Sequence, residues 1–327
     1  MLSFHAVGKG NIEVAMEGKT VPSGINWIDA VRPDAREIAF LERTLGIEVP
    51  TLETLSEIET SSRLRSEKDW LYLSIPMIHR ADGFMPALTP LGFVLSKDVL
   101  LTVRFKPMKA FDDVLGTISR CPAQVGAPGV LVVILEAIVD HAADVLEGAG
   151  SDLDSLSEEI FGTNAANVRR HRPRADGDKL RGVTRKIGRN GDLTSKIEDL
   201  LLGMARMLPY VAANAASYLE AGIRAKLESL QRDITSLNDY ETHLTDKIQF
   251  LLDATLGLTN IDQNNIFRIL TVVSVIGIPP TFFASMWGMN FKNIHEYDWT
   301  YGYEFGLFII AVSALIPIIW FKWRGWW

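Results

Sequence analysis

The sequence contains a single cysteine, Cys121, among its 327 residues, so an intrachain disulfide is excluded. Its six histidines do not fall at metal-ligand spacings with one another or with that cysteine, which argues against a zinc site. The first ten residues lack the basic and apolar segments of a signal peptide. We therefore expect the N-terminal bulk of the chain to stay in a reducing cytosol.

An excess of basic charge and the common catalytic motifs are also missing. The formal net charge is −7, whereas a dedicated nucleic-acid-binding domain usually carries a basic excess. The chain has no P-loop, no H-E-x-x-H zinc motif and no G-x-S-x-G nucleophile elbow. We expect no enzymatic activity, no catalytic residues, no organic cofactor and no nucleic-acid partner.

Long apolar runs are confined to the last fifth of the chain, at residues 266–287 and 305–321. The first run carries only Arg268 as a charge, and its length as a helix matches the hydrocarbon thickness of about 30 Å. Aromatic residues flank the second run, as they do at membrane interfaces, namely Trp299, Tyr301, Tyr303, Trp320, Trp323, Trp326 and Trp327. Lys322 and Arg324 favour a cytoplasmic tail at 322–327. The pattern predicts two membrane helices, an outer loop at 288–304 and cytoplasmic termini.

The sequence before the two apolar runs predicts two further regions. Residues 1–130 mix short strands, expected at 12–16, 70–79, 91–95 and 99–105, with a helix at 34–45 and a short helix after Pro50, which indicates a cytosolic α/β domain. Residues 131–265 show helical periodicity and form a predicted cytosolic stalk region. We expect one uninterrupted helix over about 196–287. The Arg-rich stretch 163–196 predicts either a solvated helix hairpin or a surface for anionic lipid.

Polar residues form one stripe along the first membrane helix. Positions spaced alternately by three and four residues share one helix face, and most of those inside the apolar run carry hydroxyl groups. The stripe consists of Asn264, Phe267, Thr271, Ser274, Ile278, Thr281 and Ser285. The opposite side is apolar, with Ile266, Ile269, Val273, Ile276 and Phe283.

This stripe has two interpretations. Ser and Thr promote helix packing in membranes, so the stripe could serve contact alone. Alternatively it lines a pore, which requires a symmetric ring of subunits because one helix cannot enclose a channel. In a ring, Phe267 and Ile278 would form hydrophobic constrictions, and Asp253 would continue the conduit into the cytosol. Pro279 and Pro280 should bend the helix.

The segment Trp287-Gly288-Met289-Asn290-Phe291 resembles the signature of the CorA family of magnesium channels. Its context supports the resemblance: residues 279–282 read Pro-Pro-Thr-Phe, Gly302-Tyr303 lie in the loop, and Phe321-Lys322 stand near the end. Residues 246–264 are similar to the family's stalk, and the N-terminal half matches more loosely, at Trp27-Ile28-Asp29 among others.

The resemblance implies a funnel-shaped homopentamer in the cell inner membrane that mediates Mg²⁺ influx. It also implies that Gly288, Met289 and Asn290 form the outer mouth, where a ring of Asn290 carbonyls holds hydrated Mg²⁺. Cytosolic Mg²⁺ would act as regulator as well as substrate, with Asp253 as a candidate ligand. Four further stalk acids, Asp233, Asp239, Glu241 and Asp246, are either regulatory ligands or a solvated helix face.

The outer loop departs from the usual family pattern, because Lys292 and His295 make it less acidic. Glu296 and Asp298 remain as candidate cation-attracting residues. Co²⁺ and Ni²⁺ are further possible substrates. The alternatives are a zinc transporter of the same superfamily and, from another class, a membrane scaffold or anchored domain without transport.

Overall fold

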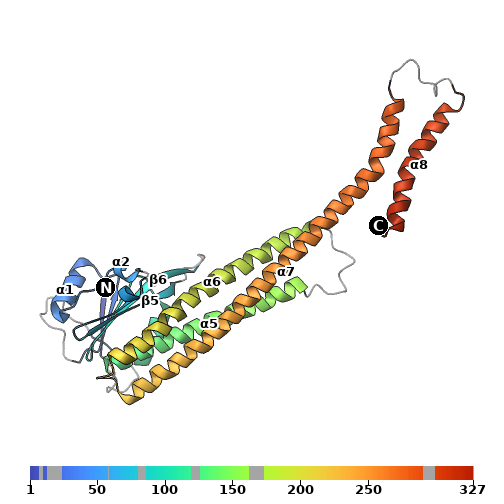
Figure 1. The fold of residues 1–327 in the computed structure, drawn as a ribbon. Coiled ribbons are helices and arrows are strands. Elements are labelled where there is room, and N and C mark those ends of the chain that lie inside the picture. The colour runs from blue at the N-terminus through green and yellow to red at the C-terminus, as the bar shows by residue number, and fades with distance from the viewer. Residues whose placement is uncertain are drawn as a thin grey trace. The chain divides into compact units, whose positions relative to one another are not determined.

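The computed structural model describes residues 1–6, 10–12, 24–57, 59–79, 86–118, 126–161, 173–289 and 299–326. The chain divides into two compact units. The first comprises Met1–Thr163 and Val183–Leu252, and the second comprises Asn164–Gly182 and Asp253–Trp327. Figure 1 shows the elements in chain order by colour. The expected N-terminal α/β domain lies within the first unit, and both apolar runs lie in the second.

In the described part of the chain, seven strands form one mixed sheet in the order β2-β1-β3-β7-β6-β5-β4. The strands are β1 (Leu2–Ala6), β2 (Gly10–Ile12), β3 (Trp27–Val31), β4 (Leu64–Glu67), β5 (Trp70–His79), β6 (Ala87–Leu95) and β7 (Leu100–Arg104). β3 and β7 pair in parallel, and the other neighbours pair antiparallel. The strands predicted at 70–79, 91–95 and 99–105 are confirmed. Of the strand predicted at 12–16, only Ile12 lies within the described residues.

Local signals define the first helices. The helix predicted at 34–45 is α1 (Ala35–Leu45), which begins with a capping box between Asp34 and Glu37. It ends at Gly46, whose φ of 67° is the left-handed conformation that glycine adopts without strain. The short helix expected after Pro50 is α2 (Leu52–Leu55), with Thr51 as its N-cap. Two further short helices are α3 (Thr60–Arg63) and α4 (Lys109–Ile118).

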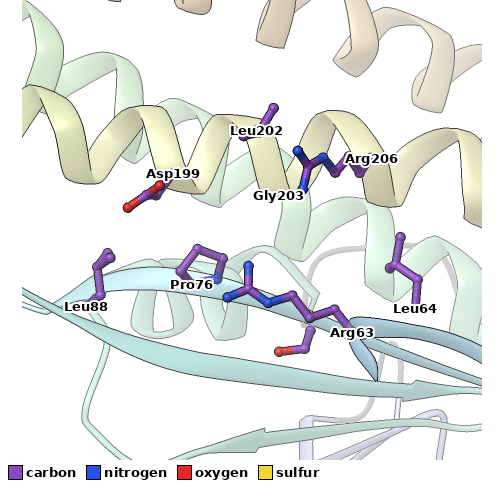
Figure 2. Close-up of a pocket in the computed structure, with 9 residues that line it drawn as sticks. Arg63, Leu64, Pro76, Leu88, Asp199, Leu202, Gly203 and Arg206 are labelled. Carbon is purple, nitrogen blue, oxygen red and sulfur yellow. The ribbon is translucent and has the colours of Figure 1, made fainter. Parts of the chain in front are cut away.

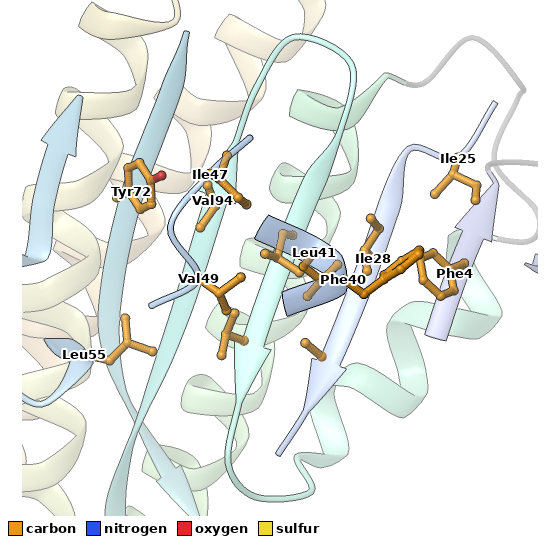
Figure 3. Packing of buried hydrophobic residues seen from close by; sticks show 13 residues of the cluster. Phe4, Ile25, Ile28, Phe40, Leu41, Ile47, Val49, Leu55, Tyr72 and Val94 are labelled. Atoms are coloured by element: carbon orange, nitrogen blue, oxygen red, sulfur yellow. The ribbon is translucent and has the colours of Figure 1, made fainter. Parts of the chain in front are cut away.

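One face of the sheet packs against α1. Phe40 and Leu41 of this helix are at most 3% exposed and lie in one buried cluster with side chains of β3, β6 and β7. Figure 3 shows them above the strands that carry Ile28 and Val94. Each fully buried aliphatic or aromatic side chain contributes about 1.5–3 kcal/mol to stability through the area it removes from water. This cluster fixes α1 on the sheet.

A buried ion pair joins two neighbouring strands. The Arg104 guanidinium donates to Asp29 at 2.7 Å, and the Thr102 hydroxyl donates to the same carboxylate at 2.8 Å. The guanidinium also lies over the Phe111 ring, 4.6 Å from its centroid. Burial lowers the pKa of His5, and the nearby Asp29 carboxylate opposes that shift. Such a pair is costly to break, because removal of one partner leaves a buried charge uncompensated.

Three long helices follow the sheet: α5 (Ala127–Phe161), α6 (Pro173–Asn214) and α7 (Ala221–Trp287). Within the first unit they lie side by side, as Figure 1 shows. Ion pairs between Lys226 of α7 and Glu136 of α5, at 3.0 Å, and between Lys247 and Asp154, at 2.5 Å, link α7 to α5. Since these pairs are largely exposed, each contributes little, and the buried apolar side chains hold the bundle.

The prediction of one helix over 196–287 was wrong. α6 ends at Asn214, whose side-chain amide donates to the Tyr210 carbonyl at 2.9 Å, and α7 begins at Ala221. Ala215 and Leu219 of the connection are buried. The break has a physical reason: it allows both helices to bury apolar faces in the same bundle, including Leu208 on α6 and the α7 side chains Leu227, Leu230 and Ile234. Long helices in the predicted region 131–265 are therefore confirmed, but α6 and α7 form a hairpin.

Candidate functional site

Two helices in the described part of the chain are long and apolar enough to cross a membrane, α7 and α8 (Gly302–Trp323). Their apolar segments have mean hydropathies of 1.8 and 2.2 and are only 6% buried within the chain. Exposed apolar surface of this extent fits lipid better than water. The 22 residues of α8 span about 33 Å at about 1.5 Å each, so this helix is longer than the predicted run 305–321 and long enough to cross.

α8 packs against one side of α7 near the end of that helix. A Cβ atom added to Gly306 would lie 3.6 Å from the Trp287 ring, an ordinary van der Waals distance, so the indole lies directly beside α8 at this position. The Phe283 ring stacks on Trp287, with 6.0 Å between centroids. Val272, Ile276, Phe283 and Trp287 are half-buried. Of the predicted apolar side, Ile276 and Phe283 are thus half-buried beside the neighbouring helix, whereas Ile266, Ile269 and Val273 are 59–63% exposed.

The chain after α8 turns back onto the end of the helix. Gly325, with φ of 71°, donates to the Lys322 carbonyl, and the Trp326 amide donates to the Phe321 carbonyl at 3.0 Å. This is the Schellman arrangement, in which a stacked Trp326 covers Phe321, which is only 2% exposed. Arg324 lies over the Trp320 ring at 5.7 Å. Residues 324–326 therefore pack around the end of α8.

The predicted stripe of α7 lies on the surface of the chain. Six of its seven side chains are exposed, including Phe267 at 64% and Ile278 at 65%, and Ser274 is half-buried. The seven residues lie on one face of a continuous helix, and the chain itself leaves most of that face uncovered. Phe282, which the sequence pattern did not single out, is 62% exposed and stands four residues after Ile278. That i, i+4 spacing was the available signal that it flanks the stripe.

Two hydroxyl groups of the stripe donate to their own helix. The Thr271 hydroxyl donates to the Phe267 carbonyl at 2.8 Å, and the Thr281 hydroxyl donates to the Gly277 carbonyl at 2.7 Å. A hydroxyl group has one proton and two lone pairs, so each oxygen keeps its acceptor capacity on the exposed face. The stripe consequently presents hydrogen-bond acceptors. The water molecules bound to a cation need such acceptors, because they donate their protons outward.

The proline pair lies inside α7 without ending it. Because Pro279 and Pro280 have no amide proton, the carbonyl groups of Val275 and Ile276 lack their usual helical donors. Freed backbone carbonyls in a membrane helix require a neighbouring helix or water. The expected bend therefore coincides with added backbone polarity in the middle of the span.

The end of α7 is described up to Met289. The helix ends at Trp287, and the Gly288 amide still donates to the Ala284 carbonyl at 3.0 Å. Met289 is 52% exposed. The predicted outer-mouth residue Asn290 and the loop candidates Glu296 and Asp298 lie outside the described residues.

Acidic residues on α7 differ in their surroundings. Asp253, Asp233, Asp239 and Asp246 are exposed, as a solvated helix face would be, whereas Glu241 is only 4% exposed. Burial raises the pKa of Glu241, the nearby Glu198 raises it further, and the Thr245 hydroxyl that donates to it at 2.7 Å opposes the shift. No three His, Cys, Asp or Glu residues in the described ranges are grouped so that they could hold a metal ion.

The family of the CorA-like Mg²⁺ transporter protein matches residues 22–323. The "Magnesium transport protein CorA" of Pasteurella multocida is 30% identical over 302 residues, which cover 92% of this chain and 91% of that protein. The complete structure of the CorA magnesium transporter from Methanocaldococcus jannaschii has a TM-score of 0.77 at 20% identity and covers 100% of this chain and 99% of that one. The ZntB cytoplasmic domain from Vibrio parahaemolyticus has a TM-score of 0.54 at 11% identity and covers 80% of this chain and 98% of that one.

Proposed function

The chain belongs to the CorA-like Mg²⁺ transporter family, and we propose that it conducts Mg²⁺ through a ring of identical subunits, each of which contributes the hydroxyl stripe of α7. Magnesium transport follows from the family. The ring is required because one α7 helix presents one polar face and cannot enclose a path by itself. We propose that the ring is a homopentamer, as the resemblance to CorA implies.

The exposed stripe of α7 is the observation that carries this proposal. α8 covers the side with Phe283 and Trp287, while the side with Thr271 and Thr281 is open to a further subunit or to water. Mg²⁺ sheds its water reluctantly, so a path that accepts hydrogen bonds from the water shell suits it better than one that binds the bare ion. Hydroxyl oxygens whose protons are engaged by the backbone meet this requirement.

Two exposed apolar residues interrupt the acceptors of the stripe. In a ring, Phe267 and Ile278 would each form an apolar collar, where water is unstable and the ion meets its highest barrier. Ile278 stands directly before the proline pair, where the helix can change direction. We propose that these two collars close the path.

The two ends of the path would carry the ion-attracting groups. At the outer mouth, Gly288, Met289 and Asn290 follow the end of α7, and a ring of Asn290 carbonyls would accept hydrogen bonds from the hydrated ion. Glu296 and Asp298 would raise the local cation concentration. At the inner end, Asn264 and Asp253 of α7 would extend the path into the cytosol. Regulatory Mg²⁺ would bind between subunits, where acidic residues of two chains can meet.

Basic residues at the end of α8 indicate how the chain is oriented in the membrane. Lys322 and Arg324 end α8, and basic residues favour the cytoplasmic side of a membrane. We therefore propose an inner-membrane protein with both termini in the cytoplasm and Mg²⁺ flow into the cell. Zinc transport is the alternative within the superfamily, but neutral oxygen atoms line the stripe, whereas zinc prefers nitrogen and sulfur ligands. Passage of Co²⁺ and Ni²⁺ is compatible with an oxygen-lined path.

A flux assay tests the proposed path. Purified protein in proteoliposomes should admit Mg²⁺ down an inward gradient, and Asn290→Ala should abolish that uptake while the assembled protein keeps its size on gel filtration. Undiminished uptake by the assembled Asn290→Ala protein would reject the outer-mouth assignment. An assembled wild-type protein that admits no Mg²⁺ would instead favour the scaffold alternative.

A further inference from the structure

A cavity of about 390 Å³ lies in the first unit between α6 and the edge of the sheet. It is lined by Arg63, Leu64, Ser74, Pro76, Leu88, Asp199, Leu202, Gly203 and Arg206. Figure 2 shows the Arg63 guanidinium in the space between the strands and the helix, and the Arg206 side chain alongside α6. The cavity is distinct from the proposed ion path, because its lining comes from α6, the end of α3, the start of β4, β5 and β6.

The charge of the cavity indicates the sign of its ligand. Two guanidinium groups face one carboxylate, which leaves a local excess of positive charge in a chain whose formal net charge is −7. No ion pair of the described residues includes Arg63, Arg206 or Asp199. Two unpaired cations that line the same concave surface attract an anion.

Arg63 is already positioned for such a ligand. Its Nε atom donates to the Glu57 carbonyl at 2.7 Å, which fixes the side chain and leaves the two terminal nitrogens for another acceptor. A guanidinium group binds phosphate through two parallel hydrogen bonds, so a fixed Arg63 and a second arginine on the opposite wall suit one phosphate group between them. Arg206 supplies that second group.

The rest of the lining argues for an organic ligand. Leu64, Pro76 and Leu88 provide apolar surface beside the arginines, and Asp199 can accept a hydrogen bond from a ligand hydroxyl or amino group. The volume lies within the usual range of small-molecule sites, about 300–1,000 Å³. Gly203 keeps the helix close to β5, because a Cβ atom there would lie 3.1 Å from Pro76 Cδ.

From these features we infer that the cavity binds an organic phosphate of the size of a nucleoside monophosphate. The phosphate lies between Arg63 and Arg206, the apolar body rests on Leu64, Pro76 and Leu88, and Asp199 accepts from the sugar or base. This site is separate from the transport path and does not depend on the proposed function.

Titration calorimetry on the full-length protein in detergent tests the inference, with EDTA present so that the probes are free of Mg²⁺. AMP should bind saturably, and it should bind more tightly than ribose 5-phosphate or inorganic phosphate. Arg206→Gln and Arg63→Gln should each weaken AMP at least about tenfold, because each removes charge-assisted hydrogen bonds. Arg189→Gln is the matched control, since Arg189 is an exposed arginine of the same helix outside the cavity, and it should leave the affinity unchanged.

Three results would overturn the inference. The first is no saturable binding of any of the three phosphates to the wild-type protein. The second is equal weakening by Arg189→Gln and Arg206→Gln, which would indicate general charge attraction. The third is that Arg63→Gln or Arg206→Gln disrupts assembly but leaves the affinity for AMP unchanged. That result would mean that the arginines contact another subunit and not a ligand. Arg206 is exposed, so its substitution should leave folding intact. The Arg206→Gln variant therefore still tests the inference if Arg63→Gln destabilises the chain.

Discussion

Removal of the hydroxyl groups of Thr271 and Thr281 should slow Mg²⁺ transport without harming the helix. Valine has nearly the shape of threonine and a similar helix propensity, but it cannot accept a hydrogen bond. Since each hydroxyl donates to its own backbone at 2.7–2.8 Å, the function lost on the exposed face is acceptance from the ion's water shell.

The size of the effect follows from the geometry. One hydrogen bond lost between a ring of threonines and the ion's water shell costs about 1 kcal/mol, or about fivefold in rate. The two threonines are ten residues apart, about 15 Å along the helix, so an ion passes them one after the other and the higher barrier limits the rate. We expect Thr271→Val and Thr281→Val each to slow uptake by up to about fivefold, and the double variant to be at least as slow as the slower single variant.

The measurement is initial Mg²⁺ uptake into proteoliposomes that contain equal amounts of assembled protein. Thr259→Val is the matched control, because the Thr259 hydroxyl makes the same bond to the Thr255 carbonyl at 2.8 Å but lies off the stripe. Thr271→Ser should retain most of the rate. Wild-type flux in the double valine variant, or an equal loss in Thr259→Val, would refute the role of the hydroxyl groups.

Three other predictions concern gating and stability. Ile278→Ser should wet the proposed collar and raise ion leak above wild type in the same vesicles, and an unchanged leak would count against a gate there. Arg104→Met should cost about 3–5 kcal/mol in urea unfolding, because it leaves the buried Asp29 carboxylate without its cation, and adding Asp29→Asn should recover most of that loss. Burial raises the pKa of Glu241 in the folded protein above its ordinary value of 4.5, so the folded state binds the proton more tightly and stability falls as pH rises through the folded pKa. Glu241→Gln should therefore gain stability relative to wild type as the pH is raised from 4.5 upward, and a pH-independent difference would contradict this.

Much of the fold could be predicted from local signals. Pro33 and Gly46 bracket α1, and β5 matches the predicted range of 70–79 because its β-branched and aromatic residues are bounded by Asp69. The sequence missed β3, because this strand carries Asp29, and a charge in a short run argues against a buried strand. The carboxylate is tolerated only because Arg104 arrives from β7, a contact that no local pattern announces.

The missed break between α6 and α7 has a similar cause. Helical periodicity continues across Asn214, and the apolar faces on both sides are equally compatible with one stalk or with a hairpin. Only tertiary packing decides between them. The stripe of α7 could be predicted because helix geometry alone places its members on one face, whereas the exposure of Phe282 depends on where α8 packs.

Cysteine accessibility tests most directly whether the hydroxyl stripe lines a water-filled path. With the single native cysteine replaced by Cys121→Ser, cysteines at Ser274, Thr281 and Ser285 should react with a charged, membrane-impermeant thiol reagent in the assembled protein, and the reaction should block Mg²⁺ uptake. Cysteines at Ile276 and Phe283, on the side that α8 covers, should neither react nor block. Equal reactivity on both sides of the helix, or full uptake after modification of the stripe, would contradict the account.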